Sequence, residues 1–187
     1  MKQFNRSSIG ILFLSIFGLF SCVNESSNTL ENDPYFDLRG FIEEKIQEVD
    51  GIEVRKDSKI QGEEKQADVI FFSKDWDDEL KVFTDADINR VSLLQSYDTT
   101  SSDELLTHEL LPKAEGKVKL IKVTYFEDEV SSVSIKIAEK NLFYTSTTLA
   151  DLYMNNATHQ IDHYSIETTQ KVWFMEENYM KIKGEVK

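Results

Sequence analysis

The chain of 187 residues carries 34 acidic and 21 basic side chains, which give it a formal charge of −13 at pH 7. Proteins that bind nucleic acid neutralise phosphates with clustered lysine and arginine, so this acidic balance excludes a nucleic-acid partner. The single cysteine excludes an internal disulfide, and the fold must therefore be stabilised by packing.

The first residues have the three-part layout of an export signal. Lys2 and Arg6 supply the positive charge, and an uncharged, mainly apolar run extends from Ile9 to Phe20 before Ser21. As a helix this run rises about 18 Å, whereas a bilayer core needs roughly 20 residues to be crossed. The pattern predicts a removable signal peptide over residues 1–21 rather than a membrane span.

The end of the apolar run, Leu19-Phe20-Ser21-Cys22, resembles the lipobox of bacterial lipoproteins. This resemblance implies cleavage before Cys22, a diacylglycerol on the Cys22 thiol and a further acyl chain on the new amino terminus. Each buried methylene contributes about 0.8 kcal/mol, so more than one chain gives durable membrane anchoring. The alternative is an ordinary thiol at the end of an uncleaved anchor.

A polar segment follows the cysteine and precedes the first structured residues. The lipidated cysteine and this segment, residues 22–32, are expected to form a flexible tether, because the segment has too few apolar side chains to support a core. Ten flexible residues have a root-mean-square reach a little under about 20 Å. The rest of the chain, residues 33–187, is expected to form a single domain.

Two helices and a strand are predicted at the start of this domain. Asp33-Pro34 has the pattern of a helix start, and apolar residues then recur at helical spacing from Leu38 until Gly51. Alternation over Ile52–Ile60 predicts a strand. Spacings of three and four from Val69 to Phe83 favour a second helix over a strand.

The second half of the domain has the alternation of short strands with hairpin-length gaps. The predicted strands are Val118–Phe126, Val130–Ile137, Leu142–Leu149, Tyr164–Phe174 and Met180–Val186. Strands joined by such short turns run antiparallel. We therefore expect an α+β fold, with N-terminal helices packed on one face of a mostly antiparallel β-meander sheet.

Two side-chain patterns resemble metal sites in part. His159 and His163 would share an ion on a helix, but the strand context predicts a separation of about 13 Å, so both are expected to be solvated. The run from Asp85 to Asn89 begins like an EF-hand calcium loop, yet Arg90 stands where that loop needs glycine. No metal is expected.

Catalytic motifs are missing from the sequence. There is no Gly-x-Ser-x-Gly elbow, and the scattered glycines form neither a P-loop nor a dinucleotide fingerprint, so no cofactor and no catalytic residue is predicted. Paired carboxylates for hydrolysis stay open, because a chain with 34 acidic residues always places some pair at a suitable separation.

Aromatic residues crowd the strand half and offer a possible binding surface. Neighbouring aromatics in a strand point to opposite faces, so some must leave the core. The candidates for lining a groove for an apolar or carbohydrate ligand are Tyr125, Tyr144, Tyr164 and Trp173. The alternative is that these are strand-favouring residues half exposed at a surface.

The overall layout looks like the envelope lipoproteins of Bacteroidota-type bacteria. Asp98-Thr99-Thr100 is similar to the O-glycosylation sequon of those bacteria, which implies a glycan on Thr99. Val23-Asn24 lacks the acidic run associated with surface export, so the resemblance favours an outer-membrane protein facing the periplasm and leaves surface exposure open.

Three functions are compatible with these features. The leading hypothesis is a non-catalytic, membrane-anchored envelope lipoprotein whose sheet face binds a protein partner or a small apolar ligand. A lipid carrier of the half-barrel type would require a continuous apolar cavity between sheet and helices. A carboxylate-based hydrolase would require two acids in one cleft with raised pKa values.

Overall fold

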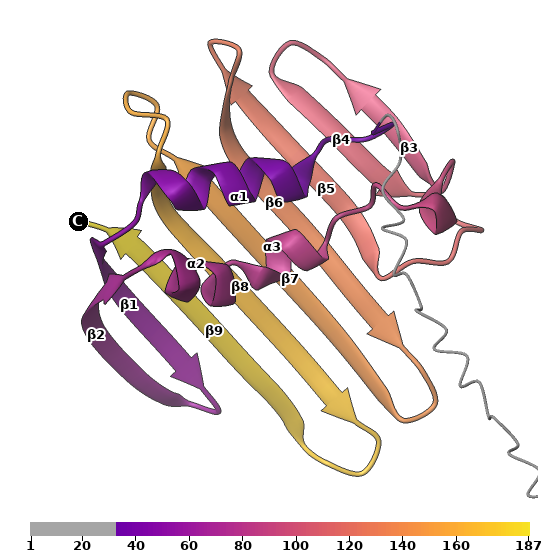
Figure 1. The fold of residues 1–187 in the computed structure, drawn as a ribbon. Helices are drawn as coiled ribbons and strands as arrows, with labels where there is room; N and C mark the ends of the chain where they lie inside the picture. The colour runs from indigo at the N-terminus through magenta and orange to yellow at the C-terminus, as the bar shows by residue number, and fades with distance from the viewer. Residues whose placement is uncertain (1–32) are drawn as a thin grey trace, which may run out of the picture.

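The computed structural model describes residues 33–187, which form a single broad antiparallel sheet with a few short helices (Figure 1). The predicted signal peptide, Cys22 and the tether lie outside the described residues. Among residues 33–187 no helix is long and apolar enough to cross a membrane.

Nine strands pair in the order β2-β1-β9-β8-β7-β6-β5-β4-β3. The strands are β1 Ile52–Ile60, β2 Glu63–Phe71, β3 Tyr97–Ser101, β4 Leu105–Leu110, β5 Val118–Phe126, β6 Glu129–Lys140, β7 Tyr144–Met154, β8 Ile161–Val172 and β9 Glu177–Val186. From β3 to β9 each strand pairs with the next, and the β1–β2 hairpin joins the far edge through β9. The antiparallel meander predicted from the sequence is confirmed.

The helices are short beside this sheet. They are α1 Leu38–Glu48, α2 Ser73–Glu79, α3 Lys81–Asp85 and the 3-10 turn η1 Val91–Leu93. The fold is therefore dominated by sheet, and the predicted α+β class overstates the helical part. The first helix also begins later than Asp33-Pro34 suggested, because the Asp37 carboxylate caps it by accepting the N–H of Gly40 at 2.9 Å.

The predicted helix from Val69 to Phe83 is wrong in its first residues. Val69–Phe71 complete β2, which pairs with β1 along its whole length, and the chain turns at Gly62, where φ is +89°. This hairpin pairing outweighs the helical spacing of the apolar residues. Helix α2 then starts at Ser73, where the Asp75 carboxylate accepts the N–H of Phe72 at 2.9 Å.

Strand ends in the meander differ from the prediction where two turns occur. The Asn141 side chain accepts the N–H groups of Phe143 at 2.8 Å and Tyr144 at 2.9 Å, so β7 begins at Tyr144 and not at Leu142. Strand β8 similarly ends at Val172, before Trp173. Aromatic residues that the alternation assigned to strands thus lie in turns.

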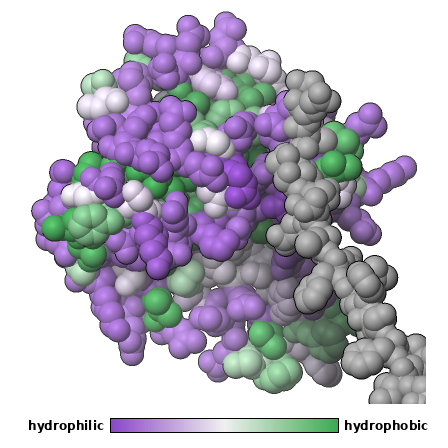
Figure 2. All heavy atoms as spheres, in the orientation of Figure 1, coloured by the Kyte–Doolittle hydropathy of each residue, from purple (hydrophilic) through white to green (hydrophobic). Residues whose placement is uncertain are grey.

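The apolar core joins helices and strands. Trp76 in α2 is fully buried, lies edge-on to the Tyr164 ring of β8 at 6.1 Å between centroids, and donates its Nε1–H to the carbonyl of Val49 at 2.9 Å. In Figure 1 the helices are drawn in front of the upper parts of the central strands. The same view of the surface, Figure 2, is mostly hydrophilic and has separate hydrophobic groups.

Candidate functional site

The two sides of the sheet differ sharply in character because strand side chains alternate. Val54 and Tyr164 point into the core, so their neighbours Arg55 and Ser165 point to the other side. We call this second side the charged face. It is defined by three rows of paired side chains that cross the strands.

The rows follow the register of the sheet. The first runs Arg55, Glu185, His163, Tyr153, Ser132; the second Asp57, Lys183, Ser165, Asp151, Ser134, Lys122; the third Lys59, Lys181, Glu167, Leu149, Lys136, Leu120. Most members are charged or carry a hydroxyl group. Such a surface suits polar contacts over a wide, flat area.

Part of this charge is neutralised within the face. Lys181 pairs with Glu167 at 2.8 Å, and Lys59 with Glu64 at 2.7 Å. The hydrogen bond from Lys181 lowers the pKa of Glu167, and that from Lys59 lowers the pKa of Glu64. Both carboxylates are therefore stabilised as anions, the opposite of what a catalytic acid needs.

Three lysines on the charged face make no ion pair with any residue that the structure describes. They are Lys122, Lys136 and Lys183 on β5, β6 and β9, and each side chain is exposed. Asp57, opposite Lys183 in the register, accepts instead from the Gln66 side chain at 2.7 Å. These ammonium groups are free to meet carboxylates of another molecule.

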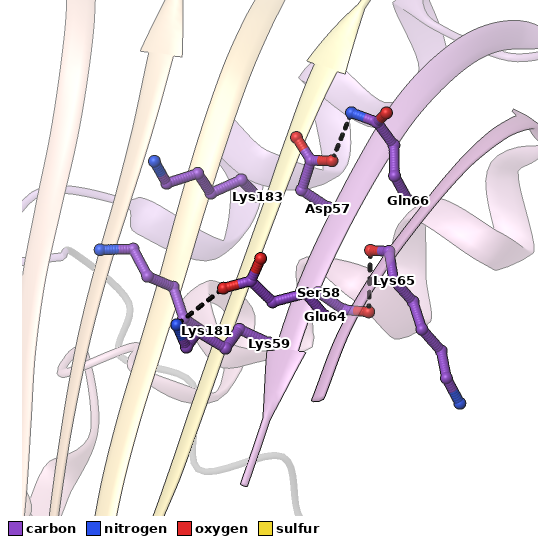
Figure 3. Close-up of a pocket in the computed structure, with 8 residues that line it drawn as sticks. All are labelled: Asp57, Ser58, Lys59, Glu64, Lys65, Gln66, Lys181 and Lys183. Atoms are coloured by element: carbon purple, nitrogen blue, oxygen red, sulfur yellow. Dashed lines mark hydrogen bonds and ion pairs between the residues drawn. The ribbon is translucent and has the colours of Figure 1, made fainter. Parts of the chain in front are cut away.

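An open hollow of about 460 Å³ lies at the β1, β2 and β9 end of the sheet. Figure 3 shows its lining, with Lys59 directed at Glu64 and Gln66 at Asp57, while Lys183 extends alone. All eight lining residues are polar or charged: Asp57, Ser58, Lys59, Glu64, Lys65, Gln66, Lys181 and Lys183. The hollow can hold polar or anionic groups, and no apolar residue lines it.

The aromatic residues predicted to line a groove are not gathered into one. Tyr164 is buried and its hydroxyl donates to Glu79 at 2.9 Å, while burial raises its pKa. Tyr144 donates to Glu139 at 2.7 Å, Tyr125 is half-buried in β5, and Trp173 is 80% exposed in the β8–β9 turn. Tyr144 and Trp173 lie near each other at one end of the sheet, but Tyr125 and the buried Tyr164 do not join them in a groove.

The remaining predicted residues also find separate roles. Thr99 lies in β3, and its Oγ1 is 2.9 Å from Nδ1 of the buried His108. His163 stacks on Tyr153 with centroids 4.4 Å apart and bonds Asp162 at 2.7 Å, while His159 occupies a turn at φ +57°. Within residues 33–187 no three His, Cys, Asp or Glu side chains are grouped as metal ligands.

Comparisons of the chain with protein-family models, with curated proteins and with solved structures found no match. The site is therefore defined by geometry alone. Sequence reasoning missed the free lysines of the charged face, because only the register across five strands brings them to one surface. Alternation within each strand was the one available signal.

Proposed function

We propose that this protein is a non-catalytic envelope lipoprotein, anchored through lipid on Cys22, that binds a protein partner with its charged face. The anchor is supported by the lipobox-like Leu19-Phe20-Ser21-Cys22 at the end of an uncharged apolar run. The binding role rests on one observation: three exposed lysines of the charged face, Lys122, Lys136 and Lys183, make no ion pair with any of residues 33–187.

A protein fits this surface better than a small apolar ligand. Apolar ligands occupy concave, mostly apolar pockets that bury most of their surface. The face carries few large apolar side chains, of which Leu149 is 43% exposed and Tyr153 38%. Complementary charge over a flat area gives specificity and fast association to protein complexes.

The helices bear on which side of the sheet is open to a partner. We propose that α1, α2 and α3 cover the core-facing side and so leave the charged face for the partner. The Trp76–Tyr164 ring contact and the bond from Tyr164 to Glu79 support this arrangement. The predicted location, an outer membrane with the domain facing the periplasm, follows from the lipobox resemblance and the residues after Cys22.

The two alternatives have less support. A lipid carrier needs an apolar cavity, whereas the four hollows described at the surface are open and lined mainly by polar residues. A carboxylate hydrolase needs an acid with raised pKa. Among residues 33–187 four carboxylates have a shifted pKa, and hydrogen bonds from lysines lower it in each: Glu64, Asp68, Glu139 and Glu167.

Site-specific photo-cross-linking in cells tests the partner surface. A photoreactive residue at Lys136, on the charged face, should give a discrete cross-linked product, while one at the exposed Glu44 of α1 should not. Charge reversal at Lys183 should reduce the yield at position 136. The matched control is Lys113→Glu in the exposed β4–β5 loop, which should leave the yield unchanged. Equal cross-linking from Glu44 would refute the assignment.

A further inference from the structure

The four most exposed large apolar side chains of residues 33–187 lie in two neighbouring turns, and Met175 stands beside them in the second turn. Leu142 and Phe143 of the β6–β7 turn are 89% and 68% exposed, and Trp173, Phe174 and Met175 of the β8–β9 turn are 80%, 81% and 57% exposed. We call these five residues the apolar tip. Large aromatics rarely stand this far into water without a binding role.

A backbone hydrogen bond joins the two turns, and further bonds hold each turn in its shape. The Trp173 N–H donates to the carbonyl of Phe143 at 2.9 Å, directly beyond the Tyr144–Val172 pair that ends the β7–β8 ladder. The Asn141 side chain holds the first turn, and the N–H of Met175 bonds the carbonyl of Val172 at 3.1 Å in the second. The backbone that carries the aromatic side chains is therefore already ordered, so binding need not order it further.

We propose that the apolar tip inserts into the headgroup region of the lipid bilayer to which the protein is anchored. Tryptophan and phenylalanine on an otherwise polar body bind at the membrane interface, where their rings leave water. The five side chains project from turns, and only Met175 also borders a surface hollow, so the other four are free to insert between lipids. In Figure 2 hydrophobic atoms mark the lower end of the molecule, where Figure 1 places these turns.

The charges around the apolar tip indicate which kind of lipid surface it would enter. Lys140 and Lys171 stand at the ends of β6 and β8, but Glu176 and Glu177 follow the second turn, and the whole chain has a formal charge of −13. An anionic surface would repel this body more than it would attract the two lysines. Insertion should therefore be driven by apolar burial and should be strongest with zwitterionic lipids.

The length of chain before the domain allows the tip and the anchor to share one leaflet; this step rests on the proposed lipid anchor. The described chain begins beside His108, since the Phe36 N–H donates to His108 Nε2, and the register places His108 level with Ile135. Seven residues of strand from Ile135 to Leu142 span about 23 Å. Ten tether residues extend to about 33–36 Å, which exceeds that span.

Trp173 itself can report the insertion. The full chain, purified with its lipid and reconstituted into phosphatidylcholine vesicles with acyl chains brominated near the headgroups, is compared with its Trp173→Phe variant. The difference isolates Trp173, because the other tryptophan, Trp76, is fully buried. We expect vesicle binding to shift the Trp173 emission to shorter wavelength and the brominated chains to quench it, while the emission of the Trp173→Phe variant is unaffected.

A second variant keeps Trp173 as the fluorescent reporter and makes the rest of the apolar tip more polar. Phe143→Ser with Phe174→Ser should lose the quenching and restore access of acrylamide to Trp173, while the emission of Trp76 shows that the fold is intact. Trp173 that stays open to acrylamide in vesicle-bound protein would overturn the inference. The inference would also be overturned if Trp173 became protected from acrylamide as the protein concentration rises in the absence of vesicles. That result would show that the apolar tip binds a second copy of the chain. Failure to float with vesicles at all would instead refute the anchor.

Discussion

The ring of Tyr164 in β8 occupies the space that a side chain at Gly184 in the neighbouring strand β9 would need. The two residues are register partners, and a Cβ at position 184 would lie 2.2 Å from Cε1 of Tyr164. The ring is buried and also bonded to Glu79, so it has no free space to move into. Glycine is required here by close approach rather than by backbone conformation.

Gly184→Ala should therefore destabilise the protein by about 1–3 kcal/mol, as overpacking of a core does. Urea unfolding followed by Trp76 fluorescence measures this change. In a Tyr164→Ala background the same glycine substitution should cost much less, because the clashing ring is gone. Equal costs in the two backgrounds would show that Tyr164 is not the obstacle.

Glu79 links a helix to two strands and should stabilise the fold more than a surface carboxylate does. It accepts from Tyr164 at 2.9 Å and from Lys56 of β1 at 2.5 Å, with its side chain 11% exposed. Glu79→Ala leaves both donors without their acceptor in a half-buried site. We expect a loss of about 1.5–3 kcal/mol in the free energy of unfolding, measured by chemical denaturation.

The matched control for Glu79→Ala is an ion pair that is exposed to solvent. Lys81 and Asp85 pair at 2.6 Å on α3 with side chains 63% and 58% exposed. Lys81→Ala should change the free energy of unfolding by about 0.5 kcal/mol or less. If Lys81→Ala costs as much as Glu79→Ala, burial is not what gives the Glu79 contacts their strength.

Local patterns predicted strands whose alternation is unambiguous, among them β1, although its second partner β9 is distant in sequence. Strand β5 begins and ends at the predicted Val118 and Phe126, since hairpin pairing keeps the alternating apolar residues on one side. Strand β2 was missed, because Val69–Phe71 have both helical spacing and β-prone side chains. Only pairing with β1 resolves that ambiguity, and pairing is not visible in a hydrophobic pattern.

The binding surfaces were harder to predict than the strands. Trp173 was identified as a candidate, but it was assigned to a strand, and its position in a turn beside Phe143 depends on a bond between two hairpins. The free lysines on β5, β6 and β9 come from segments up to 61 positions apart, from Lys122 to Lys183. The strand register across the sheet brings these lysines to one surface, and the sequence alone does not specify that register.

Stability should depend on pH through His108. The Phe36 N–H donates to Nε2 at 3.1 Å and Nδ1 is 2.9 Å from Thr99 Oγ1, so the neutral ring satisfies both contacts. Burial lowers the pKa of His108 below its ordinary value of 6.5. As the pH falls below about 6.5 the unfolded state therefore binds more protons than the folded state, and the free energy of unfolding decreases.

Urea unfolding between pH 7.5 and 5.5 measures this slope, which is at most about 1.4 kcal/mol per pH unit for one histidine. His108→Gln removes the titrating group and keeps a side chain that can accept from Phe36, so its slope should be smaller. His159 and His163 remain in both proteins and cancel in the comparison. An unchanged slope in the variant would contradict the assignment to His108.

Cys22→Ser tests the lipid anchor on which the cellular location depends. Because serine has no thiol to receive diacylglycerol, the variant should move from the membrane fraction to the soluble fraction or remain as uncleaved precursor, while the wild-type chain stays with membranes. Mass spectrometry should find acyl chains on Cys22 of the wild type and no residue before it. Ser21→Thr alters the neighbouring position and keeps the thiol, so it should retain the lipid. Wild-type protein with an unmodified thiol would contradict the anchor, because a span of about 12 residues is too short to replace it.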